Sequence, residues 1–436
     1  MKIALVNPPN CGRSIPEEEF GITSLKMIFR GEPLALEMLA GNLLGHDVQI
    51  IDLKADPDGL QEILTEGGKP DLVGITGVTC EANTVITLAE TLKRAFPDKS
   101  PIIVVGGHHA SCDPSYFNRA CIDYVVVGLG KLSFRILVDA LAADTEPPTI
   151  PGIIRVQPNA PLSLAPRRYD FNDLVDHQAP RYDLVERHRA KYVMSGVGGK
   201  VGFVATAFGC THCCSFCSIP AMTGGQYLSH SVQSIIRDIK LLPDIPLIRF
   251  VDANTFGDLP MAKSLAEKII ELGITKKIVV DVRADTVVAN PGLMRLWKQA
   301  GLEAVVIGFE EIDDNRLRQM NKHSSLDKNV AAMQVLAEIG IRVVGDFIIS
   351  PDYSYEDFKR LSRFIESSPI ALPIPSILTP LPGTALYRRY QNEIEITNLD
   401  YYTFSNAVIP TKLAKKEFYT LYSDLLKGLH QHITQD

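Results

Sequence analysis

The chain has 436 residues, of which 46% are hydrophobic and 22% are charged, a composition ordinary for a soluble globular protein. This length exceeds the size at which a single hydrophobic core keeps growing, so two or three domains are expected. The formal net charge of −7 offers no basic footprint of the kind that nucleic-acid binding needs, so nucleic acid is not expected as a partner.

The N-terminus, MKIALVNPPN, has a short apolar run that two prolines end, and the chain has no apolar run long enough to cross a membrane. We therefore expect neither a secretory signal nor a membrane span, and a cytoplasmic location. Four of the eight cysteines lie between positions 210 and 217, unlike the disulfide framework of a small secreted domain. This distribution favours metal or redox chemistry in a reducing compartment.

Residues 1–143 alternate strand-like and helix-like patterns. Five short, β-branched apolar runs are bounded by Gly, Pro or Asp, as fully buried parallel strands are. Apolar residues at helical spacing separate them, for example between Val85 and Leu92 and between Leu34 and Leu44. The pattern predicts a doubly wound, Rossmann-like α/β domain. The five runs are 3–6, 48–51, 72–75, 102–105 and 124–127.

Residues 144–200 are richer in Pro and polar residues and are interpreted as a linker. Within it, IIRVQPNAPLSL (153–164) predicts a hairpin, because Pro158 and Asn159 supply turn chemistry.

Residues 201–385 resume the alternation of strands and helices. Six successive βα units predict a partial barrel, with the active site at the carboxyl ends of its strands. The segment 386–436 lacks that alternation and is expected to be mainly helical, with one amphipathic helix near its end. The six predicted strands are 201–207, 246–252, 277–282, 304–309, 342–349 and 371–378.

The run GCTHCCSFCS contains Cys210, Cys214 and Cys217 at CxxxCxxC spacing, directly after a strand-like segment. One interpretation is a structural zinc site, which Cys213 and His212 could complete, but zinc sites usually draw four ligands from two separated pairs. The alternative is an iron–sulfur cluster, for which three thiolates leave one iron open.

The cysteine run, at the end of the first strand of a six-unit barrel, resembles the cluster loop of radical S-adenosylmethionine (SAM) enzymes. The resemblance implies that Cys210, Cys214 and Cys217 hold a [4Fe–4S] cluster whose fourth iron binds SAM. It also implies that Phe216 shields the cluster. Further segments carry the same resemblance, among them RFVDANTF (249–256) and the run from 281 to 314.

The resemblance places SAM contacts at strand ends. It implies that Asp252 and Asn254 accept the methionine amine, that Arg283 pairs with the methionine carboxylate, and that Glu310 accepts from the ribose hydroxyls. Asp252 could instead cap the following helix. Arg283 and Glu310 could instead form a salt bridge between adjacent strand ends.

The first domain resembles the cobalamin-binding domain that precedes many radical SAM barrels. Two departures from that pattern stand out: DLKAD (52–56) lacks the histidine of a DxHxxG motif, and Leu129 and Lys131 replace the acidic residues of a GEGE-like run. No histidine is therefore offered as a lower ligand of cobalt. The cobalamin contacts that the resemblance implies are Thr76, Val78, Thr79, Gly106, Gly107, His108 and Gly128.

The resemblance implies a cobalamin-dependent radical methyltransferase that acts on an unactivated carbon of a small molecule or of a lipid or tetrapyrrole-type metabolite. An electron donor such as flavodoxin or ferredoxin would reduce the cluster. The alternatives are a radical cyclase, oxidase or rearrangement enzyme, with the cobalamin domain used or unused, and a cobalamin or redox sensor that does not cleave SAM. No side chain is assigned as a catalytic residue.

Overall fold

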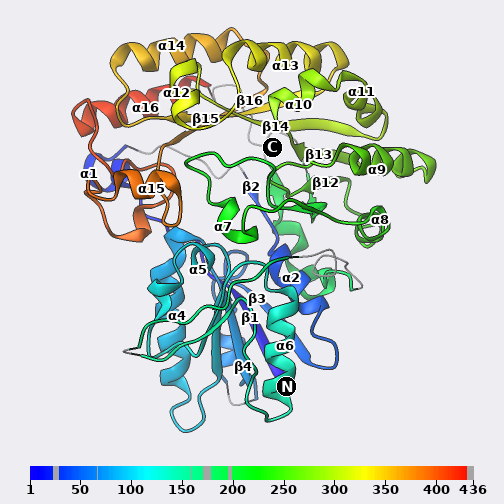
Figure 1. The fold of residues 1–436 in the computed structure, drawn as a ribbon, viewed down its shortest axis with the longest axis vertical. Coiled ribbons are helices and arrows are strands. Elements are labelled where there is room, and N and C mark those ends of the chain that lie inside the picture. The colour runs from blue at the N-terminus through cyan, green and yellow to red at the C-terminus, as the bar shows by residue number, and fades with distance from the viewer. Residues whose placement is uncertain (23–28, 66, 159, 170–177, 195–198, 430–436) are drawn as a thin grey trace.

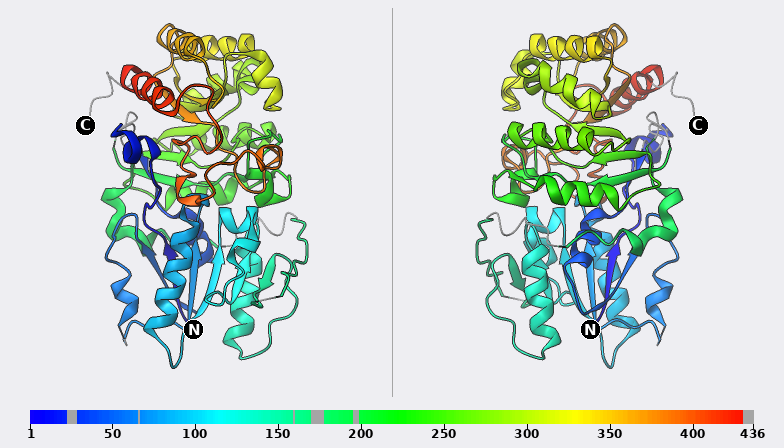
Figure 2. Two further views of the ribbon diagram at one scale, coloured as in Figure 1. Left: turned by 90° about the vertical axis from the view of Figure 1, so that its left-hand side faces the viewer. Right: turned by 90° about the vertical axis from the view of Figure 1, so that its right-hand side faces the viewer.

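The computed structural model describes residues 1–22, 29–65, 67–158, 160–169, 178–194 and 199–429. Two halves are stacked along the long axis of the molecule, one built on each of two six-stranded sheets (Figure 1). The two side views show the same division (Figure 2). Among the residues described, no helix combines the length and apolarity needed to cross a membrane.

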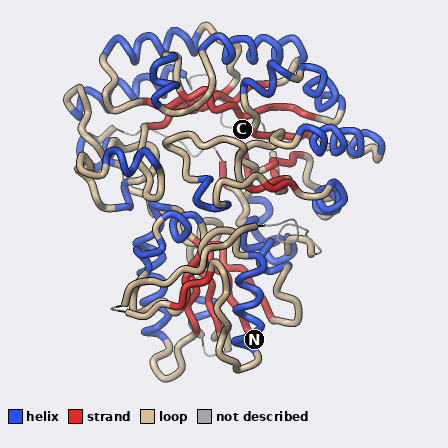
Figure 3. Tube along the Cα trace, in the orientation of Figure 1, coloured by secondary structure: helices blue, strands red, loops and turns tan. Residues whose placement is uncertain are grey.

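The sheet of the first half has the strand order β3-β1-β4-β5-β6-β7. All its strands are parallel except β7, which runs antiparallel to β6. Helices cover both faces of this sheet (Figure 3), which explains why its strands are short and almost wholly apolar. The bounds are Lys2–Asn7 for β1, Asp47–Asp52 for β3, Leu72–Thr76 for β4, Ile102–Gly106 for β5, Tyr124–Val126 for β6 and Ile153–Arg155 for β7.

This arrangement confirms the predicted Rossmann-like fold. Helices α2 (Leu34–Gly41) and α6 (Lys131–Ala142) pack on one face of the sheet, and α4 (Ala82–Ala95) packs on the other. The strand order reverses between β1 and β4, the place where sheets of this kind bind ligands beyond the strand ends. Those carboxyl ends face the second half of the molecule (Figure 1).

The sheet of the second half has the order β16-β15-β14-β13-β12-β9, and all six strands are parallel. Strands that follow one another along the chain are neighbours in space, which confirms the predicted partial barrel. The bounds are Val201–Val204 for β9, Leu247–Phe250 for β12, Lys277–Asp281 for β13, Leu302–Glu310 for β14, Arg342–Ile349 for β15 and Leu372–Ile377 for β16.

All of the barrel helices except α10 and α11 begin where a side chain supplies an N-cap. The side chains of Ser231, Asp258, Asp313, Ser325 and Ser354 each accept a hydrogen bond from a backbone amide of the first turn. The barrel helices are α8 (Val232–Lys240), α9 (Leu259–Glu271), α10 (Ala284–Ala289), α11 (Pro291–Gln299), α12 (Asp314–Gln319), α13 (Leu326–Ile339) and α14 (Tyr355–Glu366).

One hydrophobic cluster joins the two halves. It runs from Leu5 and Val104 of the first sheet, through α2, to Phe203 and Val279 of the second sheet. Burying an aliphatic side chain of this size contributes roughly 1.5–3 kcal/mol relative to leaving it exposed. The relative placement of the halves therefore rests on a shared core.

The stretch between the two sheets differs from its prediction. Ile153–Arg155 forms β7, which extends the first sheet beside β6. Residues 160–164 form no strand, so the described residues do not make the expected hairpin, and Asn159 lies outside them. The open edge of β6 explains the difference, because it offers a ready partner for an apolar segment.

The C-terminal segment docks on the loop that follows β1. The backbone amide of Arg13 donates to the carbonyl of Asp400 at 2.8 Å, and that of Ile15 donates to Oδ1 of Asn406 at 2.8 Å. Helix α15 (Ala385–Tyr390) precedes this contact, and α16 (Lys415–Leu429), the expected amphipathic helix, follows it. The segment therefore spans both halves of the molecule.

Candidate active site between the two sheets

The three predicted cluster ligands lie in the loop 209–218, which follows the short strand β10 (Ala207–Phe208). The loop turns at Gly209, which has φ 82°, and a Cβ there would collide with the carbonyl oxygen of Gln226. The three cysteines are half-buried, whereas their neighbour Cys213 is exposed. Burial and spacing thus distinguish Cys213 from the three predicted ligands.

The thiol chemistry fits a metal cluster. Burial raises the pKa of Cys217 to about 11 and also raises that of Cys214. Such thiols lose their protons readily only against a strong positive charge, which bound iron supplies. Within the described residues, no group of three or more His, Cys, Asp or Glu side chains could hold a single metal ion. A cluster of several irons suits three thiols from one loop better.

A second segment, Met320–His323, holds the cysteine loop from outside. The Nδ2 of Asn321 donates to the carbonyl of Cys213 at 2.9 Å, and the amide of Ser215 donates to the carbonyl of Met320 at 2.9 Å. Asn321 and His323 have φ of 53° and 54°, a left-handed conformation that costs free energy in non-glycine residues. The segment is thus kept in a strained shape where it meets the loop.

The side chain of Phe216 packs against buried apolar side chains. It packs against a small cluster made by Met320, Ile348, Leu378 and Leu386. The ring therefore forms part of an apolar wall beside the cysteine loop, as its predicted shielding role requires.

Asp252 is buried, at 3% exposure, beyond the end of β12. Its Oδ1 accepts from the backbone amides of Thr206 and Ala207 at 2.7 and 2.9 Å, and its Oδ2 accepts from the Thr206 hydroxyl. Burial raises the pKa of Asp252 despite these bonds. The alternative that Asp252 caps the next helix is wrong, because Asp258 caps α9.

Asn254 lies next to the cysteine loop. Its Nδ2 lies 3.3 Å from the hydroxyl of Thr211, between the first and second cysteines. Its Oδ1 is buried and accepts no hydrogen bond from the residues that the structure describes. An unused buried acceptor costs free energy, so this oxygen fits an amine-bearing ligand such as SAM.

Arg283 and Glu310 are joined by Lys322. The Nη2 of Arg283 donates to the carbonyl of Lys322 at 3.0 Å and to Asp285, and the Nζ of Lys322 lies 2.6 Å from Oε1 of Glu310. Arg283 and Glu310 are therefore each in an ion pair, with Asp285 and Lys322, but not with each other as the alternative interpretation held. Sequence reasoning missed Lys322, because one lysine after a short helix has no distinguishing pattern.

Glu310 has a strained backbone, with φ 65°. A non-glycine residue in this region costs on the order of 1–3 kcal/mol, and such residues concentrate at functional sites. The register between β14 and β15 also shifts between Gly308 and Glu310. The end of β14 therefore departs from regular strand geometry at Glu310.

Further charges lie inside the barrel. Nη2 of Arg249 lies 2.5 Å from Oδ2 of Asp281. Asp346, on β15, is enclosed near these groups and near Glu310, and desolvation together with the neighbouring carboxylates raises its pKa to about 8. Asp346 is therefore mostly uncharged at neutral pH.

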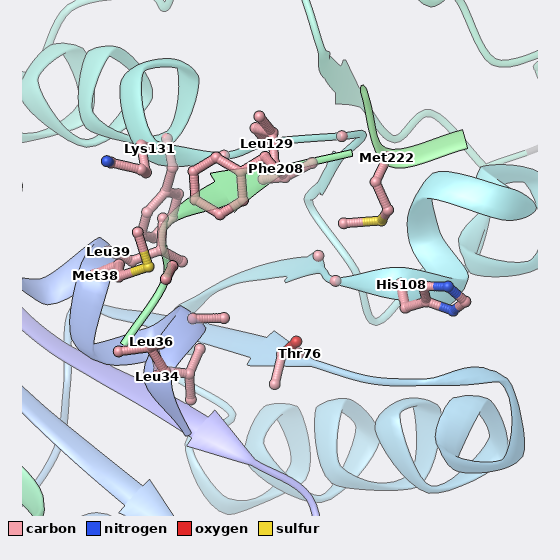
Figure 4. A pocket seen from close by; sticks show the side chains of 18 of the residues that line it. Leu34, Leu36, Met38, Leu39, Thr76, His108, Leu129, Lys131, Phe208 and Met222 are labelled. Atoms are coloured by element: carbon pink, nitrogen blue, oxygen red, sulfur yellow. The ribbon is translucent and has the colours of Figure 1, made fainter. Parts of the chain in front are cut away.

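A cavity of about 330 Å³ opens at the carboxyl ends of β4, β5 and β6. Of the predicted cobalamin contacts, Val78 and Thr79 do not line it. Side chains of α2 that sequence reasoning missed form its floor, and Met222 and Phe208 close it from the second half (Figure 4). The predicted contacts that line the cavity are Thr76, Gly106, Gly107, His108 and Gly128.

Two glycines shape the turns at the edge of this cavity. Gly107 has φ 91°, and a Cβ there would collide with the Thr76 hydroxyl. Gly128 has φ 80°, and a Cβ there would collide with the hydroxyl of Tyr169. Packing within the protein therefore requires both glycines, and they keep tight the turns that border the mostly apolar cavity.

The cavity also draws residues from the barrel. Ala205 and Ala207 line it from the end of β9 and from β10, and Val251 and Ala253 line it on either side of Asp252. The small residue Ala253 therefore faces the cavity. The predicted cobalamin and SAM sites meet at this wall.

Comparison with known families agrees with this division. Residues 25–138 match the B12 binding domain family, and residues 204–365 match the radical SAM superfamily. The first match covers most of the sheet above which the cavity opens. The second covers the cysteine loop and most of the barrel.

Two curated proteins are similar over most of their length. The hopanoid C-3 methylase of Methylococcus capsulatus is 30% identical over 402 residues, covering 90% of this chain and 75% of its own. An uncharacterised methyltransferase of Pyrococcus horikoshii is 28% identical over 458 residues, covering 99% of this chain and 95% of its own.

A solved structure shares the fold. The radical SAM methyltransferase TsrM of Kitasatospora setae, solved with cobalamin and a [4Fe-4S] cluster bound, matches with a TM-score of 0.68 at 20% identity. The match covers 91% of this chain and 76% of that one.

Proposed function

The chain belongs to the radical SAM enzymes that carry an N-terminal cobalamin-binding domain, and from this membership we propose that it is a methyltransferase acting on an unactivated carbon. Its cofactors are a [4Fe–4S] cluster, SAM and cobalamin. When bound, these supply a 5′-deoxyadenosyl radical that removes a hydrogen atom and a methyl group that replaces it.

One observation supports this function above others: the apolar cavity is bounded by both halves and lies against the helix that follows the cysteine loop. A methyl donor and a radical source must act on one substrate, so their sites must adjoin. A sensor would not need the two sites to share a wall. The methyltransferase names of the two curated relatives point the same way.

We assign the cluster to Cys210, Cys214 and Cys217. Cys213 is left outside the cluster, since it alone of the four cysteines is exposed and its Sγ lies 3.6 Å from the Nδ2 of Asn321.

For SAM, we assign the methionine amine to the unused Oδ1 of Asn254. Arg283 and Glu310 complete the SAM site, aligned through Lys322. Asp252, whose oxygens accept from Thr206 and Ala207, positions the strand end rather than binding the amine directly.

We assign cobalamin to the cavity between the halves, with Thr76, Gly106, Gly107, His108 and Gly128 along its wall. Val78 and Thr79 are left out of the assignment because they do not line it. The division of the chain at residues 143, 200 and 385 stays a prediction.

The substrate is proposed to be a small molecule, with a lipid or tetrapyrrole-type metabolite as its class. Flavodoxin or ferredoxin is proposed as the electron donor, and no nucleic acid is expected at a chain with net charge −7. We further propose a cytoplasmic location, because all eight cysteines are free and the cluster ligands must stay reduced.

The test is an anaerobic assay of the reconstituted enzyme with SAM that carries a deuterated methyl group, with a hopanoid and a total bacterial lipid extract as acceptors. The expected result is a product heavier by the labelled methyl, formed together with 5′-deoxyadenosine. Deoxyadenosine with an acceptor that is oxidised or cyclised, and never methylated, would contradict the proposal. A cluster that never cleaves SAM would indicate a sensor.

A further inference from the structure

Helix α7 (Ile219–Thr223) lies between the two predicted cofactor sites (Figure 1). It begins two residues after the cluster ligand Cys217. The same helix forms part of the cavity wall through Ile219, Met222 and Thr223. A single turn of helix therefore borders both sites.

One hydrogen bond joins the cavity wall to the cysteine loop directly. The Oγ of Ser218, which follows Cys217, lies 2.7 Å from Nε2 of His108. Ser218 is 8% exposed, and His108 lines the cavity at the end of β5. His108 and Met222 lie at the same end of the cavity, away from Lys131 (Figure 4).

The backbone that carries His108 has little freedom. Gly107 precedes it in a left-handed conformation against Thr76, and the amide of the following His109 donates to the carbonyl of Gly77 at 3.0 Å. The end of the first sheet thus holds His108 next to Ser218. A ligand that contacts this wall of the cavity would therefore also affect the hydrogen bond between His108 and Ser218.

A second set of bonds reaches the far end of α7. The amide of Leu129, on the cavity wall, donates to the hydroxyl of Tyr169 at 2.8 Å. Tyr169 and Gln226 exchange two hydrogen bonds of 2.9 and 3.0 Å, and the carbonyl of Gln226 accepts from the hydroxyl of Thr223 at 2.8 Å. Hydrogen bonds thus link both ends of α7 to the cavity wall of the first half: through Ser218 and His108 at its start, and through Thr223, Gln226 and Tyr169 at its end.

We propose that α7 couples the two cofactor sites, so that cobalamin and the cluster each bind more tightly when the other is present. Cobalamin in the cavity orders Met222 and the bond between His108 and Ser218, and this fixes the loop at Cys217. Whichever cofactor binds first bears the free-energy cost of ordering α7. The inference rests on the cofactor sites assigned under the proposed function, and it makes His108 a positioning residue.

The test measures hydroxocobalamin affinity by anaerobic equilibrium dialysis, using enzyme with a reconstituted cluster and enzyme without iron. Coupling free energies of this kind correspond to factors of about 5 to 150, so we expect at least fivefold tighter binding in the cluster-loaded wild type. In His108→Leu the ratio falls to about one, whereas His108→Gln, which keeps a side-chain hydrogen bond to Ser218, retains most of it. Ser218→Ala repeats the test if the leucine variant does not fold.

Leu39→Ala is the matched control. Leu39 lines the cavity from α2, at the end away from His108 and Met222 (Figure 4), so its truncation weakens cobalamin binding equally with and without the cluster and leaves the ratio unchanged. As a second measurement, hydroxocobalamin shifts the electron paramagnetic resonance spectrum of the reduced cluster in the wild type but not in His108→Leu.

Equal cobalamin affinity in the two wild-type forms overturns the coupling, and so does a full ratio in His108→Leu. If labelled methyl transfer persists in that case, the proposed function stands without the coupling. If neither wild-type form binds cobalamin, the cavity assignment and the coupling are both overturned.

Discussion

The ammonium of Lys322 lies 2.6 Å from a carboxylate oxygen of Glu310, with both side chains largely buried. Nothing in the chain pattern links these residues, yet their pairing sets the geometry of the predicted SAM site. The carbonyl of the same lysine holds Arg283.

Replacing Lys322 with Met should destabilise the enzyme. Removing one partner of a buried ion pair leaves the other charge uncompensated, which costs roughly 3–5 kcal/mol. The double variant Lys322→Met, Glu310→Gln should recover much of that loss, because no unpaired charge remains. Thermal unfolding of the four proteins in a double-mutant cycle measures this, and additive effects would contradict the pairing. Equilibrium dialysis with SAM should show weaker binding in both single variants.

Single Cys→Ser substitutions should separate the cluster ligands from their neighbour. Variants at Cys210, Cys214 and Cys217 should lose bound iron and the visible absorbance of the cluster, and deoxyadenosine formation should fall to background. Cys213→Ser is the matched control, since that thiol is exposed, and it should keep both. Loss of the cluster in Cys213→Ser would redefine the ligand set.

Gly106→Leu should block cobalamin without disturbing the cluster. A Cβ at this position meets Val126 at an ordinary 3.4 Å, so Gly106→Ala should fold and bind normally, whereas a leucine side chain would occupy the cavity. We expect cobalamin affinity to fall about tenfold or more, corresponding to 1.4 kcal/mol or more. Iron content serves as the internal control, and unchanged cobalamin binding would place the ligand elsewhere.

Asp346→Asn should flatten the dependence of stability on pH. The folded protein raises the pKa of Asp346 from 3.8 to about 8, so the native state binds this proton more tightly than the unfolded chain does. Stability is therefore lost as pH rises between those two values, and the uncharged asparagine removes that loss. Melting temperatures of the iron-free protein at about pH 5 and about pH 8 test this.

The expected result is that the variant gains stability relative to wild type mainly at the higher pH. Asp281→Asn is the weaker comparison: burial raises the pKa of Asp281 only to about 6, because Arg249 pairs with it, so this substitution should remove a smaller loss of stability over the same pH range. An Asp346→Asn protein with the full wild-type pH dependence would show that Asp346 is ionised in the folded state.

Local patterns predicted most of the fold. Short β-branched runs become the strands of both sheets because each is buried on two faces, and that burial requires near-continuous apolar sequence. The three cluster ligands could be predicted for a similar reason, since all of them lie in one loop. Asp252, Arg283 and Glu310 came from the resemblance to radical SAM enzymes, and they lie at or just beyond the ends of β12, β13 and β14.

Contacts between distant segments could not be predicted. Ser218 and His108 are 110 positions apart, and each alone is an ordinary polar residue. The prediction of a hairpin was wrong because its expected first strand, β7, pairs with the open edge of β6. Local turn residues carry no information about such a distant partner. The resemblance implied Val78 and Thr79 as cobalamin contacts together with Thr76, but neither lines the cavity, because the chain turns away from it after β4.

The hydrogen bonds between Arg13 and Asp400 and between Ile15 and Asn406 attach the C-terminal segment to the loop that follows the first strand. The first half is tied to the second by the chain between the two sheets and again, noncovalently, by the returning C-terminal segment. A protease that cut the covalent connection near residues 144–149 would therefore leave two fragments that still elute as one particle. Separate expression of the two halves should accordingly yield pieces that recombine when mixed.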